Sequence, residues 1–183
     1  MKEPSIALVE FRSIPRGIAS ADAMVKKAPS ILLEAKTVCP GKYIVLIAGE
    51  VAEVEESLKA GLEIGGHHVV DELFLANVDL QIIPAIQACT EIEVIDALAI
   101  IETFSVASSI KAADVAVKAA NVKLIELRLA NGLGGKSFFT MTGELTEVQA
   151  AVEASLNHLK DTASLVDYSV IPNPHKDLYK KLL

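Results

Sequence analysis

The sequence is poor in aromatic residues and cysteine, and it carries no excess of positive charge. Aromatic residues make up 4% of its 183 residues, Trp is absent, and only two cysteines occur, Cys39 and Cys89. Two cysteines so far apart do not make a disulfide framework. With 17 Lys and Arg against 24 Asp and Glu, the formal charge is −7, and no basic stripe interleaved with aromatics is present. We therefore do not expect the chain to bind nucleic acid.

Long apolar runs are also missing, since no stretch approaches the ~20 residues that a membrane span needs. The start, "MKEPSIALVEF", places charge and Pro ahead of a short apolar run, unlike a signal peptide. We expect a soluble cytoplasmic protein that does not bind membranes. Hydrophobic residues nevertheless make up 51% of the chain, which is enough for the core of one large or two small domains.

The chain contains an internal repeat. Residues 7–28 align with residues 99–120 at an offset of 92, and nine of the 22 positions are identical. Chance pairing would give roughly one identity in ten. Residues 41–54 match residues 135–148 at six of 14 positions, now at an offset of 94. Two extra residues therefore enter the second copy, where "VCPGK" becomes "ANGLGGK". This indicates a loop of variable length on a fixed scaffold, and loops commonly carry function.

Each copy predicts the order strand, helix, strand, strand, helix, strand, which is an α+β layer pair. The first copy has strands over 5–11, 30–38, 42–49 and 69–78, with helices over 18–28 and 51–62; the second has strands over 97–104, 122–130, 136–143 and 163–172, with helices over 110–120 and 145–156. We expect a first domain over residues 4–88, ending in a helix-like segment at 80–88, a linker over 89–96, and a second domain over 97–183.

The second copy carries a set of recognisable motifs. They are Glu102-Thr103 at the end of the first strand, an Ala-Ala-Asp…Lys helix, a Gly-Gly-Lys turn, and Ile-Pro-x-Pro-His at 171–175. Together these motifs closely resemble a bacterial microcompartment (BMC) shell domain. The first copy matches less tightly and lacks the terminal motif. The resemblance covers nearly the whole chain, and it implies two tandem BMC domains with ferredoxin-like layering in a structural shell protein rather than an enzyme.

The tandem arrangement resembles the two-domain shell proteins of this family, which form trimers that mimic a six-domain hexagonal tile. The resemblance therefore implies a homotrimer, with other shell proteins and encapsulated redox enzymes as further partners. "KTVCPGKY", residues 36–43, further resembles the subtype known from propanediol-utilisation compartments. That resemblance implies one [4Fe–4S] cluster per trimer at the trimer centre.

The chemistry of Cys39 agrees with that implication. An iron–sulfur cluster normally takes four thiolates, and one chain cannot supply them. A threefold axis brings three Cys39 residues to one point and leaves the fourth iron to a non-protein ligand. Pro40 stiffens the turn, the N–H of Gly41 remains free to bond cluster sulfur, and Lys42 could offset the cluster charge. The corresponding second loop has no side chain able to bind iron; it consists of Asn131, Gly132, Leu133, Gly134 and Gly135.

Several residues also have simpler interpretations. A lone cysteine is most often a small buried hydrophobe, and Cys89 keeps that interpretation. The pair His67–His68 suggests a metal, but adjacent residues point apart and no further ligand lies nearby in the sequence, so a solvated helix end is expected. His175, in the terminal motif, is expected to be structural. "NGLGGK" lacks the spacing of a phosphate-binding loop.

Lys26 and Lys118 occupy the same helix position in the two copies, four residues after Asp22 and Asp114. This spacing predicts an i,i+4 ion pair on a solvated face. The family resemblance instead implies that these lysines lie at the tile edge and pack against the neighbouring tile. Both interpretations can hold together.

Two alternative functions remain open from the sequence. In the first, a shell protein without a cluster lines a small-molecule pore with its Cys39 loops. In the second, duplicated α+β domains form a trimeric regulator that binds small molecules between subunits. The regulator would need charged or phosphate-binding loops, which "CPGK" and "NGLGG" do not provide. No nucleophile–base–acid set is visible, so an enzyme is the least expected outcome.

Overall fold

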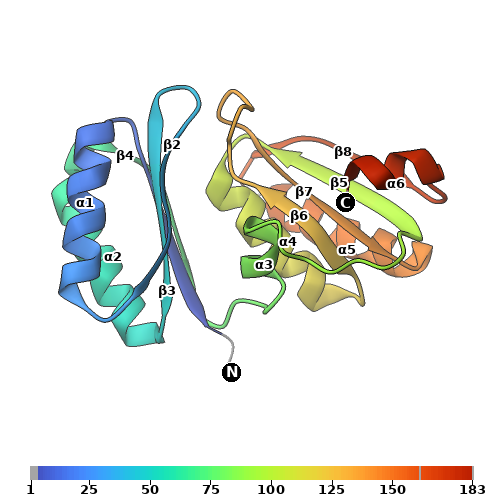
Figure 1. The fold of residues 1–183 in the computed structure, drawn as a ribbon, viewed down its shortest axis with the longest axis horizontal. Coiled ribbons are helices and arrows are strands. Elements are labelled where there is room, and N and C mark those ends of the chain that lie inside the picture. The colour runs from blue at the N-terminus through green and yellow to red at the C-terminus, as the bar shows by residue number, and fades with distance from the viewer. Residues whose placement is uncertain (1–3, 161, 183) are drawn as a thin grey trace. The chain divides into compact units, whose positions relative to one another are not determined.

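The computed structural model describes residues 4–160 and 162–182, and the chain divides into two compact units between Val78 and Asp79. Each unit contains one four-stranded sheet and a pair of long helices (Figure 1). The first unit consists of β1 (Ser5–Phe11), α1 (Ile14–Lys27), β2 (Ile31–Val38), β3 (Lys42–Gly49), α2 (Val51–Gly65), the single-turn helix η1 (Gly66–His68) and β4 (Val69–Leu75).

The second unit repeats this order and adds a short helix at each end. It consists of α3 (Ile82–Ile86), β5 (Ala97–Thr103), α4 (Val106–Ala119), β6 (Lys123–Arg128), β7 (Ser137–Gly143), α5 (Leu145–Lys160), β8 (Leu165–Ile171) and α6 (Lys176–Leu182). The helix α3 contacts β6 and α4, so residues 79–88, which we expected in the first domain, belong to the second unit. Within the described part of the chain, no helix is long and apolar enough to cross a membrane.

The two sheets have the same topology. The strand orders are β2-β3-β1-β4 and β6-β7-β5-β8, and all neighbouring strands are antiparallel. Even the irregularities recur, because the register shifts at Glu10/Phe11 in the first sheet and at Glu102/Thr103 in the second. The strand and helix order predicted from the sequence is therefore confirmed, and the sequence repeat is a structural repeat.

The first unit is held together by a core between its sheet and its two long helices. Ala7, Val9 and Phe11 of β1 alternate along the strand and point to the same face, as period-2 spacing requires. They pack with Met24 of α1 and Leu58 of α2. In both units the first long helix follows a serine whose hydroxyl accepts a backbone hydrogen bond from its first turn, which stabilises the helix start.

The helix pair is packed differently in the two units. In the first unit, a Cβ on Gly61 would lie 2.6 Å from the side chain of Met24, which is fully buried. In the second unit the corresponding residues are Ser155 and Ala116, and the Ser155 hydroxyl donates a hydrogen bond to a backbone carbonyl of α4 at 2.9 Å. In the first unit the large side chain of Met24 thus packs against a glycine, Gly61. In the second unit the small side chain of Ala116 is paired with a serine, Ser155.

Because the two positions differ together between the units, we predict that substitutions at positions 24 and 61 are energetically coupled. Gly61→Ser alone should lower the free energy of unfolding by about 1–3 kcal/mol, because it overpacks the helix interface. Met24→Ala alone should lower it by about 2–5 kcal/mol, because it leaves a cavity. The double variant reproduces the pair of the second unit, so its loss should be smaller than the sum by at least about 0.5 kcal/mol. Urea unfolding of all four proteins measures this, and purely additive losses would contradict it.

Candidate functional site

The candidate site is the tip of the β2–β3 hairpin, where Cys39, Pro40 and Gly41 join the two strands. Gly41 has φ +72°, a left-handed conformation that favours glycine, and this allows the tight connection. The Cys39–Pro40 peptide bond is cis. Cys39 is an exposed free thiol. The turn predicted from "CPGK" therefore forms, and it presents a thiol to solvent at the end of the sheet.

An ion pair fixes the base of this hairpin. The Lys42 ammonium lies 3.2 Å from a carboxylate oxygen of Glu10, on the neighbouring strand β1, and the Glu10 side chain is only 1% exposed. We expected Lys42 to offset the charge of a bound cluster. In the structure its charge is shared with Glu10, because β1 and β3 are paired and bring the two side chains together. The sequence alone offers no reason to place Glu10 at this site, because its contact with Lys42 depends on the pairing of β1 with β3.

The same ion pair recurs at the base of the second hairpin. Lys136 lies 2.5 Å from Glu102, and these residues are the repeat equivalents of Lys42 and Glu10. The connection above it, residues 129–136, is longer than in the first unit. It contains four positive φ angles, at Ala130, Gly132, Gly134 and Gly135. Residues 131–135 include no cysteine, histidine or carboxylate, so this loop offers none of the usual iron ligands.

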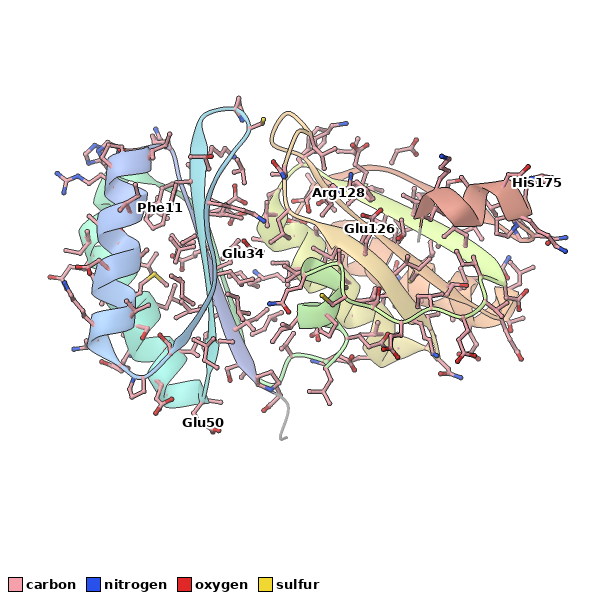
Figure 2. The ribbon with its side chains drawn as sticks, viewed as in Figure 1. Phe11, Glu34, Glu50, Glu126, Arg128 and His175 are labelled. Atoms are coloured by element: carbon pink, nitrogen blue, oxygen red, sulfur yellow. The ribbon has the colours of Figure 1, made fainter. Side chains whose placement is uncertain are left out.

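A further pair of charges lies on the edge strand of each sheet. Glu34 contacts Lys36 at 3.1 Å on β2, and their repeat equivalents, Glu126 and Arg128, are 2.8 Å apart on β6. Figure 2 shows Glu34 on β2, and Glu126 and Arg128 on β6. The Arg128 guanidinium also lies 5.4 Å from the ring centre of Phe138. Both hairpins therefore share a polar framework, and they differ at their tips.

A single chain does not form a metal site with these residues. Across residues 4–160 and 162–182, no group of three or more His, Cys, Asp and Glu side chains is placed to hold a metal ion. Cys39 nevertheless suits a ligand role, since its thiol is exposed and free at the tip of a short hairpin. A cluster bound there would need ligands from other chains.

The other sequence candidates lie apart from the hairpin tips. Cys89 is an exposed free thiol whose Sγ lies 3.3 Å from the carbonyl oxygen of Gln87, so it is not the buried hydrophobe that we expected. The rings of His67 and His68 do not point apart, because their centres are 3.9 Å from each other. Desolvation, with His67 and two nearby arginines, lowers the pKa of His68. His175 is exposed at the start of α6 (Figure 2).

The predicted lysine pairs form in both units. The Lys26 ammonium lies 2.6 Å from Asp22, and the Lys118 ammonium lies 2.7 Å from Asp114. The first pair is exposed on both sides, whereas the Asp114 carboxylate is nearly buried and also accepts a hydrogen bond from the backbone N–H of Asp79. The predicted i,i+4 ion pair therefore forms in both units. It is solvated in the first unit and partly buried in the second.

Comparison with known proteins places this architecture in a family. The family model described as "BMC domain" matches twice, over residues 5–78 and 97–174. The chain therefore belongs to the BMC-domain family of bacterial microcompartment shell proteins. It is 37% identical to the bacterial microcompartment shell protein PduT of Citrobacter freundii, over 98% of this chain and 97% of that protein.

Further relatives and solved structures agree with this assignment. The carboxysome shell protein CcmK3 of Synechococcus elongatus is 38% identical over 45% of this chain and 80% of its own length. A crystal structure of a microcompartment protein from Desulfitobacterium hafniense is 51% identical, with a TM-score of 0.93 over 97% of this chain and 98% of that one. The fused permuted hexameric shell protein MSM0275 shares the fold, with a TM-score of 0.58, at 17% identity over 87% of this chain and 85% of that one.

The two hairpin ion pairs predict unequal effects of the same substitution. Lys42→Met should lower the free energy of unfolding by about 1–3 kcal/mol, because it removes the Lys42 ammonium from beside the nearly buried carboxylate of Glu10. Lys136→Met is the matched control, and it should cost about 1 kcal/mol or less, because Glu102 is 28% exposed and can be solvated. Urea unfolding of both variants checks this ranking. Equal losses, or a larger loss for Lys136→Met, would contradict it.

Proposed function

We propose that three copies of this chain form a flat shell tile of six BMC domains that holds a [4Fe–4S] cluster at its centre. Two observations support the ring. A shell protein such as CcmK3 matches 45% of this chain along 80% of its own length, so this chain carries about two such domains. PduT, named as a microcompartment shell protein, matches along the whole chain.

The unequal burial of the two repeat copies supports self-association. Ile18 on α1 is 53% exposed, whereas its equivalent on α4, Ile110, is fully buried. Ile14 is 36% exposed, whereas its equivalent Val106 is fully buried. The first copy thus retains an exposed apolar helix face at positions that the second copy buries. A second copy of the chain that covers this face would remove it from water, which is the main driving force for association.

The observation that carries the cluster proposal is the contrast between the two hairpin tips. One tip presents the exposed thiol of Cys39, and the other presents a glycine-rich loop without metal-binding side chains. In a ring of three chains these tips alternate, so three thiolates can meet around one axis. When bound, a [4Fe–4S] cluster supplies one-electron transfer. Cys39 would provide the ligand from each chain, and the fourth iron would take a non-protein ligand.

The residues beside Cys39 would define the surroundings of the cluster. Pro40 and Gly41 keep the tip short, and the exposed backbone of Gly41 leaves its N–H available to cluster sulfur. Lys42, shared with Glu10, adds little free positive charge at the tip. The proposed task is electron transfer across the shell, or cluster exchange, with this chain, other shell proteins and encapsulated redox enzymes as partners.

A purification without oxygen tests the cluster proposal. The protein should be brown, with absorption near ~400 nm and about four irons per trimer, since each chain offers one ligand and one cubane has four irons. Cys39→Ala should be colourless and still trimeric by light scattering, because the fold depends on its apolar core and not on metal. Acid should favour loss of colour, because the thiolate ligands become protonated.

Cys89→Ala is the matched control, since Cys89 is the other exposed thiol, and this variant should stay brown. Iron near zero after anaerobic reconstitution with iron and sulfide would defeat the cluster proposal and favour a pore lined by the Cys39 hairpins. Colour retained by Cys39→Ala would move the ligand elsewhere. A monomer or an even-numbered oligomer in dilute solution would contradict the trimer.

The proposed edge role of Lys26 and Lys118 has its own test. Lys26→Ala should change the free energy of unfolding by about 0.5 kcal/mol or less, because its ion pair is exposed. Lys118→Ala should cost about 1 kcal/mol, because Asp114 is nearly buried. The double variant should remain a soluble trimer but form fewer sheets, as seen by electron microscopy. If the double variant forms tile sheets as readily as the parent, the edge role is wrong, and both lysines serve only in their ion pairs with Asp22 and Asp114.

A further inference from the structure

The outer edge of the second sheet is covered by the segment of residues 79–90. Within it, α3 contacts β6 and α4. The Gln81 side-chain amide donates to the carbonyl oxygen of Val122 at 3.2 Å and accepts from the N–H of Leu124 at 3.0 Å. The Thr90 hydroxyl donates to the carbonyl oxygen of Ile125. Backbone groups of this edge strand are therefore satisfied by the segment that precedes β5, which protects the edge from water.

The corresponding edge of the first sheet is exposed. Leu32 of β2 is 43% exposed, whereas its repeat equivalent on β6, Leu124, is 1% exposed. Beside it, Ile31 is 65% exposed. The two strands have the same place in their sheets, and they carry their register shifts at the same repeat position. The first sheet therefore has an apolar edge at the place where the second sheet is covered.

The helix α6 is the repeat equivalent of α3. An offset of 96 residues carries β4 onto β8, and it also carries Ile82–Ile86 of α3 onto residues 178–182 of α6. The helix α3 buries Ile82 completely, whereas Leu178, at the equivalent position, is 38% exposed. Among the α6 residues whose side chains are described, none is buried. Leu182 is half-buried against apolar residues of its own unit. The chain thus leaves the Leu178 face of α6 in solvent.

We propose that α6 of one chain covers the β2 edge of the neighbouring chain, as α3 covers β6. The proposal rests on the trimer put forward above. The helix α3 follows the first unit and joins the second unit. By analogy, α6, which follows the second unit, would pack on the next unit around a closed ring. In a ring of identical chains, that next unit is the first unit of another chain. The occupant is therefore a second copy of this chain.

The chemistry of α6 fits this position. Leu178 replaces Ile82 and would cover the exposed side chains of Leu32 and Ile31. Asp177 stands at the repeat position of Gln81. Its carboxylate can accept a hydrogen bond from the N–H of Leu32, as the Gln81 side chain does from the N–H of Leu124. Asp177 is 78% exposed, and although one of its oxygens lies 3.5 Å from Nδ1 of the similarly exposed His175, a carboxylate can accept several hydrogen bonds and remains accessible for this contact.

Cross-linking between chains tests the proposal. The full-length protein with Cys39→Ser and Cys89→Ser receives Leu32→Cys and Leu178→Cys, and it is treated with a short bismaleimide. We expect covalent dimers and trimers on a denaturing gel. The matched control replaces Leu32→Cys by Val70→Cys, which lies on the opposite edge strand of the same sheet and is similarly exposed, at 41%. The control should give at most a tenth of that cross-linked product.

Light scattering on the same samples separates the two proposals. A trimer that cross-links equally through positions 32 and 70, or through neither, overturns the placement of α6 and leaves the trimer standing. Cross-linking confined to single chains also overturns it. A monomer overturns both proposals.

A second measurement does not depend on introduced thiols. Leu178→Asp should raise the trimer dissociation constant at least about tenfold, because a charged group replaces an apolar side chain that becomes buried on association. Leu178→Met should keep the parent affinity, since the volume is conserved. Circular dichroism checks that both variants stay folded. Equal dissociation constants for the parent and Leu178→Asp would overturn the proposal.

Discussion

The ion pair between the first residue of β3 and the adjacent interior strand β1 is the constraint on which the site depends. It joins Lys42 to Glu10 in the first unit, and it recurs as Lys136 with Glu102 in the second. Each pair holds the base of a hairpin against the centre of its sheet. Because the base is fixed, the tip can change in length and chemistry without altering the sheet, so one scaffold carries both a thiol turn and a glycine-rich loop.

The duplication also shows where the two copies have adapted to different surroundings. Positions in the core have changed in pairs, as Met24 with Gly61 and Ala116 with Ser155 show. Positions on the outside have kept their apolar character but differ in burial, as Ile18 and Ile110 show. The differences in exposure between the two copies mark the surfaces at which we propose that chains associate.

Much of the fold can be predicted from the sequence, because buried strands and amphipathic helices have strong periodic patterns. Each pattern also occurs in both copies of the repeat, which makes it easier to recognise. The hairpin turn at Cys39 also follows from "CPGK". Three features do not. The seven-residue helix α6 is too short to show a period. The contact of α3 with β6, and that of Lys42 with Glu10, join residues whose proximity depends on tertiary pairing. The cluster that we propose at Cys39 would also need ligands from other chains, which the sequence of one chain does not reveal.

The charged pairs on the edge strands have a consequence for how such a chain avoids fibre formation. An exposed strand edge with apolar residues such as Ile31 and Leu32 is a template onto which another strand can add. Glu34 and Lys36 lie on the same strand, and another strand that adds there would have to cover their solvated charges. Charged side chains on an exposed edge strand oppose the addition of a further strand, so the Glu34–Lys36 pair limits strand addition on β2 although Ile31 and Leu32 are exposed there.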